Sequence, residues 1–148
     1  MQKARGLITV VMAEDDPDDR LLVSEAFKDA RIPARVEFVP DGEALLMLLR
    51  GEGPYGGDDH PPPGLLLLDL NMPRMGGLET LIEIRAQESL RHLPVIVLTT
   101  SASRNDILAA YRAGCNAYLC KPTTFAGLVE TVQQTLHYWL NIVEIPAP

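Results

Sequence analysis

The chain has 148 residues, of which 47% are hydrophobic and 22% charged, and its 13 basic and 20 acidic side chains give a formal net charge of −7. This length fits one soluble globular domain, and the negative charge disfavours nucleic acid as the main partner. No apolar run approaches the ~18 residues that a membrane span needs. Two cysteines are too few for a disulfide framework or a zinc site, and residues 1–6 carry no signal-peptide cleavage site, which favours a cytoplasmic location.

The first strand and helix are predicted between the N-terminus and Pro33. LITVVMA, residues 7–13, is a short apolar segment rich in β-branched residues, which predicts a strand buried on both faces. Asp16 suits the N-cap and Pro17 the first position of the helix that follows. Apolar residues recur along one face of that helix: Leu22, Val23, Ala26, Phe27 and Ala30.

The remainder of the chain repeats this pattern. Further strands are expected at 35–39, 65–70, 94–99 and 116–120, and further helices at 43–50, 77–88, 104–113 and 124–139. Asp41 caps the second helix, Gly51 ends it, and the Gly- and Pro-rich segment 51–64 is predicted to be a mobile surface loop. This alternation predicts an α/β fold, with a parallel sheet covered by helices on both faces and right-handed crossovers.

We expect residues 1–148 to form a single domain, with a core at 7–139 and a C-terminal tail at 140–148. No repeat and no second domain is apparent, and no DNA-binding or enzymatic output domain is expected after the last helix.

Polar residues stand at the ends of four of the expected strands. Glu14 and Asp15 end the first strand, and Asp69 lies near the end of the third. In an open α/β sheet, ligands bind outside the carboxyl ends of the strands where the strand order reverses; for the order 2-1-3-4-5 this point lies between strands one and three. That topology would bring the three carboxylates into one crevice, with Thr99 and Lys121 at the ends of the neighbouring strands.

Three carboxylates at close range repel one another unless a cation lies among them, and hard oxygen ligands suit Mg²⁺. Mg²⁺ and Lys121 would together neutralise a phosphoryl group, and aspartate is a known nucleophile toward phosphorus. The sequence therefore predicts a magnesium-dependent aspartyl-phosphate site at Asp69.

Simpler interpretations compete for several residues. Asp16, Asp18 and Asp19 are expected to form the solvated start of a helix, where negative charge is favourable. Lys121 could be an ordinary loop lysine and Thr99 an ordinary strand residue, but their coincidence at strand ends favours the site. Other reactive side chains are interpreted as non-catalytic histidines and small core cysteines: His60, His92, His137, Cys115 and Cys120.

Four segments together resemble the receiver domain of the two-component response regulators: AEDDPDD, LLLLDLNMPRMGG, PVIVLTTSAS and AGCNAYLCKP. The resemblance spans roughly residues 7–139 and implies a flavodoxin-like five-stranded parallel sheet; the strand order 2-1-3-4-5 used above rests partly on it. It implies that Asp69 accepts a phosphoryl group from a sensor histidine kinase, as in a phosphorelay.

The resemblance also implies roles for the neighbouring residues. Asp15 would contact Mg²⁺ directly, Glu14 would act through a metal-bound water, and Asn71 would offer its backbone carbonyl. Thr99 matches the switch hydroxyl that moves toward the phosphoryl group, and Lys121 matches the lysine of the family.

Two further implications concern Tyr118 in the fifth strand and the peptide bond just after that strand. Tyr118 matches the aromatic residue that moves with the switch hydroxyl, although strand alternation alone would allow it simply to pack. The Lys121–Pro122 peptide bond is expected to be cis, because the family uses that isomer to shape the loop.

The sequence departs from the family pattern at two places. The loop 51–64 is longer than in a minimal receiver, and Thr100 stands where alanine is frequent, so that a larger side chain would crowd the acyl phosphate. Ser101 and Asn71 occupy positions where the family tunes dephosphorylation, which leaves the phosphate lifetime open.

The final segment, HYWLNIVEIPAP, resembles the tails of small stand-alone receivers paired with phytochrome-type kinases, in which the tail and the last helix can mediate dimers. A homodimer is therefore expected. Several apolar residues would form an exposed strip that needs a cover: Trp139, Leu140, Ile142, Val143 and Ile145. The tail could instead be a frayed terminus.

The leading functional hypothesis is a response regulator that is controlled by phosphorylation and read by a protein partner at its fourth helix, fifth strand and fifth helix. It would catalyse only its own phosphorylation and dephosphorylation, and is not expected to be an enzyme in the usual sense. Two alternative functions are also compatible with this fold. A flavodoxin-like FMN-binding protein is disfavoured because EDDPDD stands where a phosphate cradle is needed. A receiver-like scaffold that never accepts phosphate would act through dimer contacts.

Overall fold

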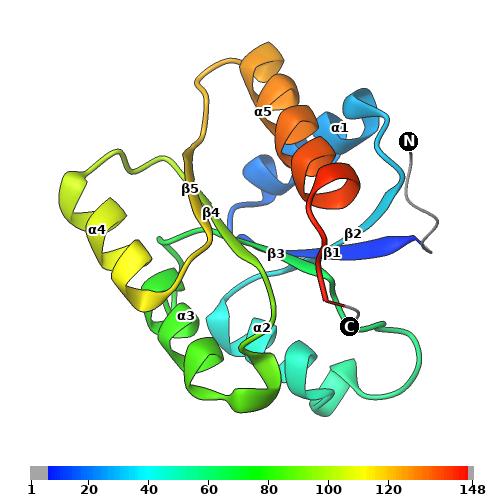
Figure 1. Ribbon diagram of the computed structural model, residues 1–148, viewed down its shortest axis with the longest axis vertical. Coiled ribbons are helices and arrows are strands. Elements are labelled where there is room, and N and C mark those ends of the chain that lie inside the picture. Colours follow the sequence, from blue (N-terminus) through cyan, green and yellow to red (C-terminus); the bar gives the residue numbers. More distant parts are fainter. Residues whose placement is uncertain (1–6, 147–148) are drawn as a thin grey trace.

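The computed structural model describes residues 7–146 (Figure 1). Strands and helices alternate along the chain. The strands are β1 Ile8–Ala13, β2 Ala34–Val39, β3 Leu65–Leu68, β4 Val95–Thr99 and β5 Ala117–Cys120; the α-helices are α1 Pro17–Ala30, α2 Gly42–Arg50, α3 Gly77–Ala86, α4 Arg104–Ala113 and α5 Phe125–His137. Two sequence-based expectations concern residues outside this range: the absence of a signal peptide at residues 1–6, and the last two residues of the tail at 140–148.

The five strands form one parallel sheet in the order β2-β1-β3-β4-β5, which confirms the predicted order. The register aligns Ala13 of β1 with Val39 of β2 on one side and with Leu68 of β3 on the other. Every residue of β3 is buried, as the four consecutive leucines predict for a strand at the centre of a parallel sheet.

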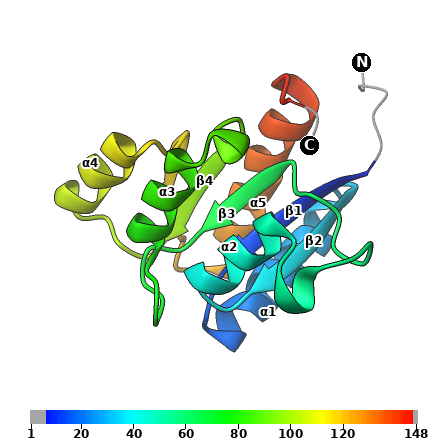
Figure 2. The same cartoon turned by 90° about the horizontal axis from the view of Figure 1, so that it is seen from below.

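Helices cover both faces of this sheet. Figures 1 and 2 show α1 and α5 together on one face and α2, α3 and α4 on the other. The β3 leucines alternate between two apolar clusters accordingly: Leu66 and Leu68 belong to the cluster beneath α2 and α3, and Leu65 and Leu67 to the cluster beneath α1 and α5. The core is therefore almost entirely aliphatic, as the scarcity of aromatic residues suggests.

The helix starts follow local side-chain chemistry. The Asp16 carboxylate accepts a hydrogen bond from the backbone N–H of Asp18, and the Asp41 carboxylate accepts one from Ala44, so both predicted N-caps are confirmed. On α1, four of the five predicted apolar positions are buried, whereas Leu22 is 43% exposed. Among the described residues, no helix is both long enough and apolar enough to span a membrane.

The tail differs from the exposed strip expected from the sequence. After α5, the chain makes one π-helical turn over Tyr138–Ile142 and then becomes extended at Val143. This turn places Leu140 in the core, 6% exposed, and Trp139 packs against the same cluster, whereas Ile142 remains 56% exposed. The expectation that Leu140 is exposed is therefore wrong, because the extra turn rotates it toward the sheet.

Two further expectations are resolved by position in the sheet. Cys115 is buried as predicted, but Cys120 is exposed, because it ends the edge strand β5 where no further strand covers it.

The long segment 51–64 is tied to β2: the His60 imidazole contacts the Glu37 carboxylate, and the Tyr55 ring lies edge-on to His60 with centroids 5.2 Å apart.

Candidate functional site

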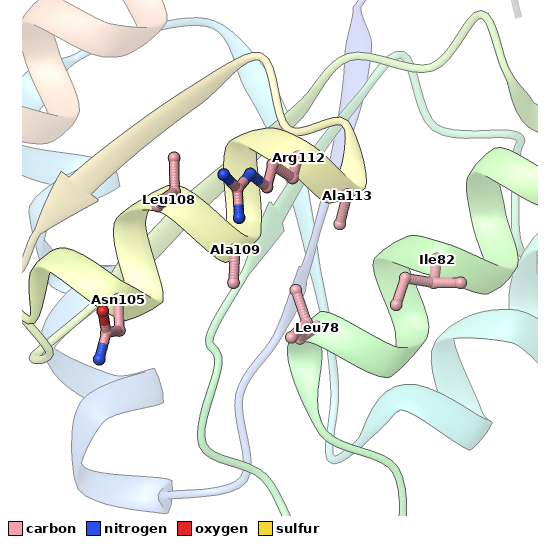
Figure 3. Close-up of a pocket in the computed structure, with 7 residues that line it drawn as sticks. All are labelled: Leu78, Ile82, Asn105, Leu108, Ala109, Arg112 and Ala113. Atoms are coloured by element: carbon pink, nitrogen blue, oxygen red, sulfur yellow. The ribbon is translucent and has the colours of Figure 1, made fainter.

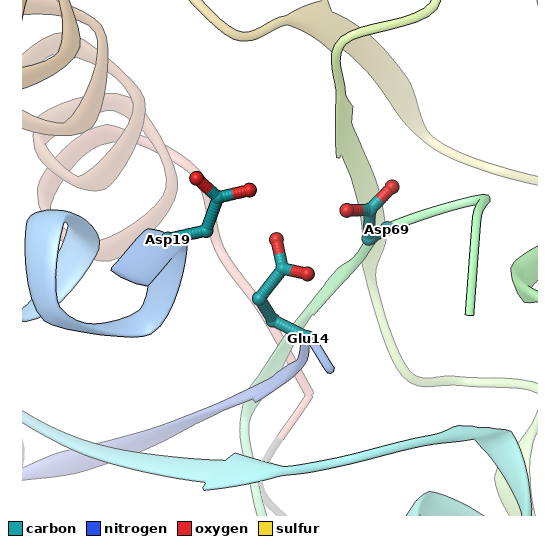
Figure 4. A group of neighbouring side chains, drawn as sticks. All are labelled: Glu14, Asp19 and Asp69. Carbon is teal, nitrogen blue, oxygen red and sulfur yellow. The ribbon is translucent and has the colours of Figure 1, made fainter. Parts of the chain in front are cut away.

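Three carboxylates converge at the carboxyl end of the sheet. Glu14 directly follows β1, Asp69 directly follows β3, and Asp19 lies in the first turn of α1 (Figure 4). One oxygen from each of these side chains lies within 4.8 Å of the others. The grouping arises because β1 and β3 are neighbours and parallel, so the residues that follow them emerge side by side.

The Asp69 side chain is almost fully buried, and both of its carboxylate oxygens accept hydrogen bonds. Its Oδ1 accepts hydrogen bonds from Thr99 Oγ1 at 2.9 Å and from the backbone N–H of Asn71 at 3.2 Å, and its Oδ2 accepts one from Lys121 Nζ at 3.0 Å. The backbone N–H of Asp69 donates to the carbonyl of Ala13 at 3.2 Å, which extends the β1–β3 ladder by one residue. The carboxylate is thus held rigidly at the end of a buried strand.

Lys121 is the positive charge at the centre of the group. Its Nζ donates to Asp69, to Asp19 Oδ2 at 3.1 Å and to Glu14 Oε1, and only 8% of its side chain is exposed. The backbone N–H of Lys121 donates to the carbonyl of Thr99 at 2.7 Å, which fixes the loop after β5 beside β4. Burial acts to lower the lysine pKa, but hydrogen bonds and charge from Glu14 and Asp69 outweigh it and hold that pKa above its usual range.

The pKa values of Glu14 and Asp69 are shifted in opposite directions. Burial raises the pKa of Glu14 to about 7, and the nearby Asp69 adds to the rise, although the Lys121 hydrogen bond opposes it. For Asp69, burial also acts to raise the pKa, but the interactions with Glu14, Lys121 and the Asn71 N–H outweigh it and lower the pKa. At neutral pH, Asp69 is therefore ionised, whereas Glu14 titrates.

The charge balance of the site suits a cation. One ammonium faces three carboxylates, and all the available side-chain ligands are hard oxygen atoms, which are the donors that divalent cations such as Mg²⁺ or Mn²⁺ accept. The residues present thus fit a divalent metal.

The structure brings together Glu14, Asp69, Thr99 and Lys121 as predicted, but it does not add Asp15 to the group. Asp15 is half-exposed, its backbone carbonyl accepts a hydrogen bond from Arg20 Nη2 at 3.2 Å, and its carboxylate has no hydrogen-bond or ion-pair partner among residues 7–146. Asn71 contacts Asp69 through its N–H.

Asp19 was missed, because the interpretation of a solvated helix start is wrong for this one residue. An N-cap at Asp16 makes Asp19 the third residue of the helix, and side chains at that position point back toward the chain that enters the helix. That geometry was available from the sequence and would have placed the carboxylate near Glu14.

The expected cis Lys121–Pro122 bond is also wrong: no cis peptide bond occurs between residues 7 and 146. The trans isomer is the intrinsically favoured one for a bond to proline, and here Lys121 Nζ reaches Asp69 in that form.

Tyr118 connects β5 to the loop that follows β4. Its hydroxyl donates to the backbone carbonyl of Ser101 at 2.8 Å, and its ring packs on the face covered by α2, α3 and α4. Ser101 in turn hydrogen-bonds through its hydroxyl to Asp106 in α4, and Thr100 is exposed. The loop that starts at Thr99 is therefore linked to both the site and the start of α4. None of the three histidines contributes to the site.

Comparison with known proteins finds a matching family model and similar chains. The model of the response regulator receiver domain matches residues 10–133. The response regulator Rcp1 of Synechocystis is 37% identical over 138 residues, which cover 93% of this chain and 92% of that protein. A structure of Rcp1 in its Mn²⁺-bound form superposes with a TM-score of 0.85 at 36% identity, covering 95% and 99% of the two chains.

Two further solved structures are similar over almost the whole chain. Response regulator RPA3017, in red light signalling of R. palustris, has a TM-score of 0.91 at 42% identity, covering 96% of this chain and all of that one. The phosphorylated cyanobacterial phytochrome response regulator RcpA has a TM-score of 0.89 at 33% identity, with the same coverage.

Proposed function

Because this chain belongs to the family of response regulator receiver domains, we propose that it is a phosphorylation-controlled signalling protein in which Asp69 is the phosphoacceptor. One observation carries this proposal: the buried, ionised Asp69 carboxylate is bonded on one oxygen by Thr99 and on the other by Lys121. These are the donors that a phosphoryl group on Asp69 would need for its own oxygens.

The proposed reaction is an in-line phosphoryl transfer from a phosphohistidine of a sensor kinase. An Asp69 carboxylate oxygen attacks phosphorus, the P–N bond breaks, and the histidine nitrogen keeps the bonding electron pair and takes up a proton. The lowered pKa of Asp69 keeps this nucleophile deprotonated at neutral pH. The Lys121 ammonium and the Thr99 hydroxyl then bind the oxygens of the transferred group.

The cation of this reaction is proposed to be Mg²⁺. When bound, Mg²⁺ would neutralise phosphoryl oxygens as charge develops on them. Asp69, Asp15 and the backbone carbonyl of Asn71 would hold it directly and Glu14 through a water, since the Asp15 carboxylate bonds to no other side chain or backbone group in the described part of the chain. Asp19 supplies further negative charge at the same place.

Phosphorylation would act on the fold through Thr99. This hydroxyl now binds Asp69 and would exchange that partner for the phosphoryl group, moving the loop that Tyr118 holds at Ser101. The surface of α4, β5 and α5 would then favour a different conformation, which a protein partner reads. The chain would thus catalyse only its own phosphorylation and dephosphorylation.

Several features of the relatives support finer proposals. Rcp1, RcpA and RPA3017 are response regulators, and RcpA is a phytochrome response regulator, which supports a phytochrome-type histidine kinase in the cytoplasm as the partner. A homodimer through the tail is supported by the exposed Tyr138 and Ile142, 51% and 56% accessible. No observation favours FMN: the turn after β1 presents Glu14, Asp15 and Asp16, which would repel its phosphate.

The test is intact mass spectrometry after incubation with acetyl phosphate, with and without Mg²⁺, on the wild type and on Asp69→Asn. We expect a gain of one phosphoryl group that requires both Mg²⁺ and Asp69. A receiver labelled in parallel serves as the positive control. If the wild type remains unmodified by acetyl phosphate and by phosphorylated phytochrome-type kinases, the scaffold alternative replaces the proposal.

A further inference from the structure

A second surface of the molecule has the properties of a binding groove. It lies between α3 and α4, and it is lined by Leu78, Ile82, Asn105, Leu108, Ala109, Arg112 and Ala113. Figure 3 shows Ala109 and Ala113 of α4 directed toward Leu78 and Ile82 of α3. Because the two alanines have short side chains, the helices are separated by a hollow rather than by interlocking apolar groups.

The groove exposes more apolar surface than a closed helix pair would. Leu78 is 37% exposed, Ile82 51% and Leu108 45%, although each lies beside a partner helix. Leu78 and Ile82 are four residues apart on α3, so they form one continuous stripe along the wall of the groove. This pattern matches surfaces that accept the apolar face of a third helix.

The charge of the groove selects the kind of helix. Arg104, Leu108 and Arg112 follow each other at four-residue spacing along α4, and Arg104 lies outside the lining of the groove. Neither guanidinium has a hydrogen-bond or ion-pair partner within residues 7–146. No carboxylate lines the groove. A surface with unpaired positive charge is therefore present on a chain whose net charge is −7.

Both walls of the groove begin at loops that leave the candidate site. The loop after Asp69 ends at Gly77, which starts α3 so close to the strand that a Cβ there would lie 2.2 Å from the Asp69 carbonyl oxygen. The loop after Thr99 leads into α4 through the contacts of Ser101. The α3 wall is thus fixed to the phosphoacceptor segment, whereas the α4 wall follows the switch loop.

From these observations we propose that the α3–α4 groove binds an amphipathic helix of a partner protein, with acidic residues beside its apolar stripe. The affinity of this binding changes when Asp69 is phosphorylated; this second part rests on the proposed function above. Large apolar side chains of the partner helix, such as leucine, fill the hollow over Ala109 and Ala113. The carboxylates of the partner helix pair with Arg112 and Arg104.

The experiment uses the full chain and two synthetic peptides of about 18 residues, long enough to form a helix on binding. Both carry leucines at i, i+3, i+4 and i+7, flanked by glutamates in one peptide and by lysines in the other. Affinity is measured by fluorescence anisotropy, and the site is located by amide chemical shifts. We expect the acidic peptide to bind at α3 and α4, and about fivefold or more tightly than the basic one.

Three variants make the test specific. Leu108→Glu should abolish binding, whereas Leu22→Glu on α1, 43% exposed in the wild type, is the matched control and should bind normally. Arg112→Glu should reverse the preference between the two peptides. The proposal is overturned if the peptides bind equally, if the shifts lie outside α3 and α4, or if Leu22→Glu weakens binding as much as Leu108→Glu.

Two controls separate this proposal from its alternatives. If sedimentation shows a dimer that Leu108→Glu converts to a monomer, a second copy covers the groove and the proposal is wrong. Asp69→Asn should bind the acidic peptide like the unmodified wild type. Peptide binding is therefore tested independently of whether Asp69 can be phosphorylated. If phosphorylated wild type, verified by mass, binds with unchanged affinity, the coupling is overturned.

Discussion

Glu14 at the end of β1 and Asp69 at the end of β3 lie in the same site, but their pKa values are shifted in opposite directions. Glu14 and Asp69 are both buried carboxylates, and both bind the Lys121 ammonium. The difference is in the other donors: Asp69 also accepts from Thr99 and the Asn71 N–H, whereas Glu14 Oε2 accepts only a long 3.3 Å bond from the Asp16 N–H. Burial acts to raise the pKa of both carboxylates. At Asp69 the interactions with Glu14, Lys121 and the Asn71 N–H outweigh burial and lower the pKa, whereas at Glu14 burial and the nearby Asp69 outweigh the Lys121 hydrogen bond and raise it.

The largest effect on stability is expected from removing the Lys121 ammonium, which pairs with both Glu14 and Asp69. Lys121→Met would leave buried carboxylates without their counter-ion and lower the free energy of unfolding at pH 8 by about 3–5 kcal/mol. Urea denaturation measures this. Lys28→Met is the matched control, because the Lys28–Glu25 pair is exposed and its loss should cost under about 0.5 kcal/mol. Equal losses in the two variants would show that the buried network does not stabilise the fold.

A smaller loss should follow from removing one donor at the β3 end alone. Thr99→Ala deletes the hydroxyl that donates to Asp69 Oδ1, and we expect the free energy of unfolding to fall by about 1–3 kcal/mol, with substantial recovery in Thr99→Ser. The exposed neighbour gives the control, since Thr100→Ala should change stability little. Urea denaturation measures the free energy of unfolding of the Thr99 variants and of the Thr100→Ala control. A destabilised Thr99→Ser would instead assign the effect to the lost methyl group.

The β1 end is best tested by pH. Because the folded-state pKa of Glu14 is raised from 4.5 to about 7, the native state binds more protons than the unfolded state between these values, and Glu14 therefore lowers stability as pH rises from 4.5 to 7. A metal that uses Glu14 must release that proton, so Mg²⁺ affinity should rise by up to about tenfold per pH unit below 7 and level off above it.

Calorimetric titration with Mg²⁺ in two buffers of different ionisation enthalpy counts the released protons. Glu14→Gln should abolish the proton release that the wild type shows at pH 6.5. Release that persists in this variant would mean that another group carries the proton.

The smallest contrast concerns the two flanking aspartates. Asp15→Asn should weaken Mg²⁺ binding more than Asp19→Asn, by about fivefold or roughly 1 kcal/mol, because the Asp15 carboxylate has no partner among residues 7–146 whereas Asp19 is held by Lys121. Both substitutions remove one charge, so each controls for the other. The reverse order would show that the metal occupies the group of Glu14, Asp19 and Asp69.

These contrasts explain what could be predicted from sequence. Asp69, Thr99 and Lys121 were found because alternation predicts parallel strands whose carboxyl ends share one edge of the sheet. The strand order that makes these ends neighbours came partly from the resemblance to receiver domains. Asp15 depends on where one half-exposed side chain points, which strand order does not determine. Leu140 and Cys120 depend on what distant elements cover: an added π-helical turn buries the first, and an uncovered sheet edge exposes the second.

Arg85 has a consequence for how α4 can move. Its guanidinium donates to the carbonyls of Gly114, Arg91 and Leu93 and to Asn116 Oδ1, at 2.8–3.1 Å, and so anchors the carboxyl end of α4 to α3 and β5. The other end of α4 is attached to the loop after Thr99, because the Ser101 hydroxyl bonds to Asp106 and the Ser101 carbonyl accepts from Tyr118. A change of conformation at Thr99 would therefore be expected to tilt α4 about Gly114 and not to translate it, with a displacement that increases along the helix away from Arg85.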